Sequence, residues 1–154
     1  IKAVSKLNYN SVWLWPNVDS GSDIISKELR ISREKNILKK TIFGKNCNPE
    51  DFLILLNNAK CIVGNSSVGI RESSYLGTPC VNIGNRQNNR LKGANVVDVP
   101  NNYKIIMKSV KKQFNRGKYK SLNIYGNGKT GQKILKIITK IKLSNTQKIL
   151  NLKP

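Results

Sequence analysis

The fold is decided by residues 61–84, which read CIVGNSSVGIRESSYLGTPCVNIG. Two short apolar runs, Cys61–Gly64 and Cys80–Ile83, predict buried strands. Between them, Val68–Leu76 has the apolar spacing of a helix, and the glycine and proline that follow predict its end. A strand, a helix and a second strand joined by short connections favour a parallel β-α-β unit.

The same alternation extends outward in both directions. Further strands are expected at 11–15, 37–43 and 94–99, and further helices at 23–35, 49–59, 102–114 and 133–141. Residues 1–8 resemble the end of a helix whose beginning is missing, which suggests a fragment. The sequence therefore predicts an α/β fold with an open parallel sheet flanked by helices. Ligands of such sheets bind at the carboxyl ends of the strands.

Composition narrows the class of protein. The chain has 154 residues, 38% hydrophobic and 23% charged, which fits one globular domain and excludes a coiled coil or a disordered tail. No apolar run is long enough for a membrane span. Three cysteines without metal spacing indicate a reducing, cytoplasmic compartment. The absence of histidine removes imidazole catalysis by this chain alone.

The net charge of +20 raises the possibility of a nucleic-acid-binding module. Residues 101–154 hold 14 of the 28 Lys and Arg and none of the 8 acidic residues. Lysine and asparagine dominate, arginine is scarce, and aromatic residues at 6% do not alternate with the basic ones as a stacking platform requires. A solvated basic face is the preferred interpretation, and a polyanion-binding surface stays the alternative.

The segment Gly64–Glu72 carries the clearest candidate site. A strand running into small polar residues and then a helix exposes backbone N–H groups at the strand end, where phosphate binds well. Ser66 and Ser67 add hydroxyl donors, and Gly69 would let a ligand approach the backbone. Glu72, one turn further, could accept both hydroxyls of a ribose. The alternative is an N-cap serine on an ordinary turn, with Glu72 paired to a lysine.

Two more loops follow predicted strands. Gly84–Arg90 contains arginines at 86 and 90, and Arg86 could clamp a diphosphate held by the neighbouring strand end. The alternative is an exposed polar loop. Pro16–Gly21 contains Asn17, and the turn chemistry of asparagine and aspartate explains it without any function.

Four motifs together resemble the hydrolysing UDP-N-acetylglucosamine 2-epimerases of sialic acid biosynthesis. They read WPNVDSGS at 15–22, GNSSVGIRE at 64–72, GTPCVNIGNRQNNR at 77–90 and IYGNG at 124–128. The match runs from about residue 10 to about 142 and is similar to the C-terminal half of that family. The non-hydrolysing branch usually shows a DSGGIQEE-like stretch where this chain has residues 65–73, so the hydrolysing branch is favoured.

The resemblance implies a two-domain GT-B-type fold in which UDP-sugar lies between two Rossmann-like halves. It implies that Ser66 and Ser67 hold the diphosphate, Glu72 the ribose and Arg86 the phosphates. It also implies that Asn17 contacts the UDP moiety and that the backbone at Cys47 meets the uracil. In the family, UDP is lost to give a 2-acetamidoglucal, and water then adds to yield N-acetylmannosamine, without nicotinamide, another cofactor or a metal.

The resemblance also sets the expected organisation. Residues 1–9 would end a helix of the missing N-terminal half or linker, 10–142 would form the UDP-binding domain, and 143–154 a polar basic tail. The family's catalytic carboxylates and histidine belong to the N-terminal half, so we expect this chain alone to be inactive. The full-length protein would be a homo-oligomer. A GT-B glycosyltransferase donor domain, a basic nucleic-acid-binding module and a decayed gene fragment are the alternatives.

Overall fold

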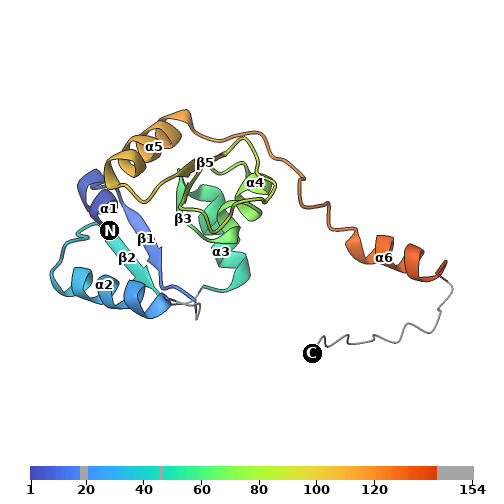
Figure 1. Cartoon of the computed structure of the whole chain (residues 1–154), viewed down its shortest axis with the longest axis horizontal. Coiled ribbons are helices and arrows are strands. Elements are labelled where there is room, and N and C mark those ends of the chain that lie inside the picture. The colour runs from blue at the N-terminus through green and yellow to red at the C-terminus, as the bar shows by residue number, and fades with distance from the viewer. Residues whose placement is uncertain (18–20, 46, 142–154) are drawn as a thin grey trace, which may run out of the picture. The chain divides into compact units, whose positions relative to one another are not determined.

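Helices and strands alternate along the chain in the order that the sequence predicts (Figure 1). The computed structural model describes residues 1–17, 21–45 and 47–141. The elements are α1 (Lys2–Leu7), β1 (Ser11–Leu14), α2 (Ser22–Glu34), β2 (Thr41–Gly44), α3 (Pro49–Asn58), β3 (Ile62–Gly64), the 3-10 turn η1 (Ser67–Gly69), α4 (Glu72–Leu76), β4 (Cys80–Ile83), β5 (Val96–Val99), α5 (Tyr103–Arg116) and α6 (Thr130–Ile138).

All described strand pairs are parallel, which confirms the predicted α/β class with a Rossmann-like arrangement of strands and helices. The strands form two hydrogen-bonded sheets, β1-β2 and β3-β4-β5, where the sequence predicted one. Strand β2 begins at Thr41, four residues later than predicted. The reason is a turn in which the Thr41 amide donates to the carbonyl of Leu38 (3.1 Å), while the Leu38 side chain is buried.

Helix α3 begins as its sequence predicts. Asn48 is the N-cap, and its Oδ1 accepts a hydrogen bond from the Asp51 amide at 2.8 Å. Pro49 occupies the first turn, where a missing N–H donor costs nothing. The acidic side chains of Glu50 and Asp51 lie at the positive end of the helix dipole.

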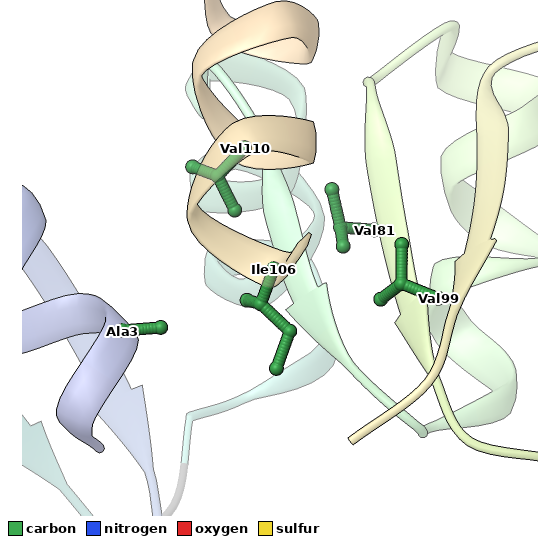
Figure 2. Packing of buried hydrophobic residues seen from close by; sticks show 5 residues of the cluster. All are labelled: Ala3, Val81, Val99, Ile106 and Val110. Carbon is green, nitrogen blue, oxygen red and sulfur yellow. The ribbon is translucent and has the colours of Figure 1, made fainter. Parts of the chain in front are cut away.

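The β3-β4-β5 sheet packs its hydrophobic core against helix α5. Figure 2 shows the five buried residues of this core: Ile106 and Val110 on α5, Val81 on β4, Val99 on β5 and Ala3 on α1. All five side chains are at most 6% exposed. This packing holds the sheet on one face and leaves the carboxyl ends of its strands open to carry polar loops.

The chain divides into two compact units, Ile1–Ile124 and Tyr125–Pro154. In the second unit, helix α6 confirms the predicted amphipathic helix, which begins and ends three residues earlier than expected. The tail predicted at 143–154 lies outside the described residues, as do residues 18–20 of the predicted turn. No helix in the described part of the chain is both long and apolar enough to cross a membrane.

Candidate functional site

The loops that follow β3 and β4 are joined to each other. Strands β3 and β4 pair in parallel with Gly64 opposite Asn82, so their carboxyl ends lie at the same edge of the sheet. The buried side chain of Gln87 spans the two loops, because its Nε2 donates a hydrogen bond to the Asn65 carbonyl at 2.8 Å. The two predicted candidate segments are therefore linked at one edge of the sheet.

The helix predicted at 68–76 is divided into the 3-10 turn η1 and the short helix α4. Ser66, the N-cap of η1, is exposed and makes no side-chain cap hydrogen bond. Gly69 is buried, and a Cβ there would lie 2.9 Å from the Cys80 sulfur. The interpretation of Gly69 as a point of ligand approach is therefore wrong, because the missing side chain makes room for Cys80.

Glu72 is the carboxylate of this loop. It is half-buried, and its Oε2 is shielded from solvent and accepts no hydrogen bond. A shielded acceptor without a donor is unfavourable, and a ligand hydroxyl or N–H group could satisfy this atom only if the Glu72 side chain turns toward solvent. Arg86, in the loop after β4, is exposed at the same edge of the sheet.

A buried network of polar side chains lies beneath the β3 loop, and the sequence analysis missed it. Asn95 is its centre: its Nδ2 donates to the Ser73 hydroxyl (3.0 Å) and to the Thr78 carbonyl (2.8 Å), and its Oδ1 accepts from the Ser74 hydroxyl (2.9 Å). The Ser73 hydroxyl donates to the Gly69 carbonyl at 2.5 Å. This network ties η1 and α4 to the residue that precedes β5, and so it supports the loop from below.

A separate set of hydrogen bonds connects α5 and the segment after it to the sheet and to the end of α4. Gln113 Nε2 donates to the carbonyls of Cys80 (3.1 Å) and Asn95 (2.8 Å), and the Tyr119 hydroxyl donates to Gln113 Oε1 at 2.8 Å. Lys118 Nζ donates to Asn57, Leu76 and Thr78, and partial burial lowers its pKa. The only sequence signal for these roles was a polar residue at an apolar position of α5, Gln113.

A pocket lies at the carboxyl ends of β4 and β5. It is lined by Gly84, Asn85, Asn88, Asp98, Val99 and Pro100. Burial alone would raise the pKa of Asp98, but hydrogen bonds from Lys92 and Asn82 and the charge of Lys92 outweigh it and lower that pKa. The Lys92 Nζ and Asp98 Oδ2 atoms are 2.7 Å apart, so this carboxylate is already neutralised by the chain itself.

Asn17 and Cys47 lie beyond the ends of β1 and β2 and are exposed. Within the described ranges, no hydrogen bond joins either residue to the β3 and β4 loops. Burial raises the pKa of Cys61 to about 12 and also raises that of Cys80, so both thiols stay protonated and unreactive at neutral pH. Across residues 1–17, 21–45 and 47–141, no three Cys, Asp or Glu side chains gather as metal ligands.

The family model described as UDP-N-acetylglucosamine 2-epimerase matches residues 1–139. The chain belongs to this epimerase family. It is 33% identical to a UDP-N-acetylglucosamine 2-epimerase of Neisseria meningitidis serogroup B over 129 residues, which are 84% of this chain and 33% of the relative. It is 31% identical to a UDP-N,N'-diacetylbacillosamine 2-epimerase (hydrolyzing) of Legionella pneumophila over 151 residues, which are 98% of this chain and 39% of the relative.

A third epimerase relative is a GDP/UDP-N,N'-diacetylbacillosamine 2-epimerase (hydrolyzing) of Campylobacter jejuni, 37% identical over 91 residues, which are 59% of this chain and 23% of the relative. The chain thus spans well under half the length of these curated epimerases. The matched range includes the β3 and β4 loops that Gln87 joins, together with Asn17 and Cys47. Family membership favours an epimerase over a glycosyltransferase.

Proposed function

We propose that this chain is the UDP-binding half of a hydrolysing UDP-N-acetylglucosamine 2-epimerase. Ser66 and Ser67 would hold the diphosphate, Glu72 the ribose hydroxyls and Arg86 the phosphate charge. Asn17 would contact the UDP moiety, and the backbone at Cys47 the uracil. Family membership supports the nucleotide-sugar class, and the joined β3 and β4 loops support one shared site.

One observation carries the proposal: the shielded and unpartnered Oε2 of Glu72. A carboxylate oxygen removed from water without a donor is unfavourable by about 1–3 kcal/mol or more, and a ribose hydroxyl would supply the missing hydrogen bond once the Glu72 side chain turns to meet it. The other candidate residues of the same edge, Ser66 and Arg86, are exposed and offer donors for phosphate oxygens. One carboxylate and several donors in the segments that follow β3 and β4 match a nucleoside diphosphate, which carries both hydroxyls and negative charge.

The chemistry assigned to this half is departure of UDP. Elimination breaks the C1–O bond of the sugar and removes the proton at C2, and water then adds to the double bond to give N-acetylmannosamine. As the C1–O bond breaks, negative charge grows on the β-phosphate, where Arg86 and the Ser66 and Ser67 hydroxyls would stabilise it. The base that takes the C2 proton is assigned to the part of the epimerase fold that this chain does not include.

The hydrolysing outcome rests on the sequence of the β3 loop. Residues 65–73 read NSSVGIRES and lack the DSGGIQEE-like pattern of the non-hydrolysing branch. The Legionella relative that covers 98% of the chain is named as a hydrolyzing enzyme, which supports the same branch. Because that relative acts on a diacetamido sugar by name, UDP-N,N'-diacetylbacillosamine is the alternative substrate.

Replacing Glu72 tests the proposal directly. Glu72→Ala should weaken binding of UDP to this chain by about 1–3 kcal/mol in a calorimetric titration, because a charge-assisted hydrogen bond is lost. Glu34→Ala, an exposed carboxylate of α2, is the control and should leave the dissociation constant unchanged. An unchanged affinity in Glu72→Ala would remove Glu72 from the site. Absence of UDP binding by the unmodified, folded chain would contradict the function.

A further inference from the structure

Gln87 is an unusual residue for a polar surface loop. Its neighbours Arg86 and Asn88 are exposed, whereas Gln87 is only 3% exposed. The Nε2 atom donates to the Asn65 carbonyl at 2.8 Å, and Asn65 directly precedes Ser66. One side chain therefore connects the residue before Ser66 to the residue after Arg86.

The orientation of the Gln87 amide is fixed by its partner. A backbone carbonyl accepts only from a donor, so the NH2 group and not the oxygen must face Asn65. The oxygen, Oε1, is then left shielded without a hydrogen-bond partner. Burial of half an amide without a partner is unfavourable, so the favourable contribution of this side chain lies in its donor half, which holds the β3 loop.

We propose that Gln87 is a positioning residue for nucleotide binding: by holding the Asn65 carbonyl it sets the Ser66 and Ser67 donors in register with Arg86. This inference rests on the UDP-binding function proposed above. The backbone register of β3 and β4 ends at Gly64 opposite Asn82, and the loop residues Asn65, Ser66 and 84–86 beyond it are exposed. Beyond that point a side-chain link is needed to keep the two loops at a constant separation, and Gln87 supplies it.

The chain offers a matched control in Gln113. This glutamine is 1% exposed, and its Nε2 also donates to backbone carbonyls, those of Cys80 and Asn95. It lies on α5, and its side-chain hydrogen bonds go to Cys80, Asn95 and Tyr119, which lie outside the loop residues 65–67 and 85–88. Gln→Glu at either position removes a buried donor at neutral pH, but only at Gln87 does the donor hold the candidate site.

The test is calorimetric titration of the chain with UDP at pH 7.5 and pH 5, with folding followed by circular dichroism. Gln87→Glu should weaken UDP binding about 10-fold at pH 7.5. The loss should shrink at pH 5, relative to the unmodified chain at the same pH, because a protonated carboxyl can donate to Asn65 again. Gln113→Glu should lower the melting temperature and leave UDP affinity within about 2-fold.

Equal losses of affinity in the two variants, or unchanged affinity in Gln87→Glu, would overturn the inference. If Gln87→Glu does not fold, Gln87→Met removes the donor without adding charge and should show the same loss, without recovery at pH 5. If the unmodified chain itself does not bind UDP, the proposed function fails. Amide hydrogen exchange then decides the role of Gln87. Exchange at Ser66 and Ser67 should be faster in Gln87→Glu than in Gln113→Glu, and equal rates would overturn the positioning role.

Discussion

The two sheets of the first unit share one strand–helix pattern but are held together differently. Between β1 and β2, the hydroxyls of Ser11 and Thr41 form a side-chain hydrogen bond at 2.7 Å. The register pair Val12 and Ile42 is 45% and 71% exposed. Around β3, β4 and β5, by contrast, the side chain of Asn95 alone makes three buried hydrogen bonds.

The difference shows which of the two sheets is held by buried side-chain hydrogen bonds. The β3-β4-β5 sheet carries the loops of the candidate site, and its buried polar network fixes η1 and α4 from below. A binding site made of short loops needs such support, because each loop residue alone has little packing to hold it in place. After the strands of the β1-β2 sheet, only a polar contact of Asn17 and a backbone contact at Cys47 are proposed.

Asn95→Ala should have the largest effect on stability. It leaves the Ser73 and Ser74 hydroxyls and the Thr78 carbonyl buried without one of their partners, so the free energy of unfolding should fall by about 3–5 kcal/mol. Urea denaturation measures this, with Asn115→Ala, an exposed position of α5, as the control. If the free energy of unfolding falls by less than about 1 kcal/mol, the buried network does not make the β3-β4-β5 sheet more stable than the β1-β2 sheet.

Gly77→Ala should have the next largest effect. Gly77 has φ +67°, and a Cβ there would lie 2.1 Å from the Tyr119 carbonyl oxygen. Gly21, before α2, has φ +80° but no described atom within 4 Å of its Cβ position. The left-handed backbone should cost about 1–2 kcal/mol in both alanine variants, and the clash should add about 1–2 kcal/mol in Gly77→Ala only. Equal melting temperatures for the two variants would contradict this difference in packing.

The ion pair of Asp98 should have the smallest effect. Its folded-state pKa is lowered, so the ionised carboxylate contributes stability that is fully present above its unfolded value of 3.8 and is lost as pH falls through the folded pKa. Lys92→Met removes the hydrogen bond and the charge that lower the pKa, and should flatten the loss of stability below pH 3.8. Thermal melts between pH 2 and 6 measure this. The same loss of thermal stability below pH 3.8 in Lys92→Met and in the unmodified chain would contradict this role of the ion pair.

The fold was largely predictable from the sequence because its signals are local. Apolar runs bounded by glycine and proline marked β3 and β4, and Asn48 with Pro49 marked the start of α3. The late start of β2 depends on a turn closed by Leu38, and the separation of the strands into two sheets depends on pairing between distant segments. Such pairing is not encoded in any single stretch of sequence.

The candidate residues could be proposed from the sequence only where their position after a strand end suggested a role. Ser66, Glu72 and Arg86 follow strand ends, and their chemistry suggests their roles. Gln87 could not be recognised among the polar residues of its loop, because its importance lies in a contact with Asn65, 22 residues away. Gly69 was misinterpreted for the same reason: its neighbour, Cys80, comes from the next strand.

The central claim is that UDP binds at the joined β3 and β4 loops, and amide chemical shifts of the isotope-labelled chain test it most directly. On titration with UDP, the account predicts saturable shifts that are largest at residues 64–72 and 84–88, with no comparable response to AMP. Shifts confined to the basic residues of α5 and α6, or an equal response to AMP, would contradict the account. They would indicate a general polyanion-binding surface in place of a uridine diphosphate site.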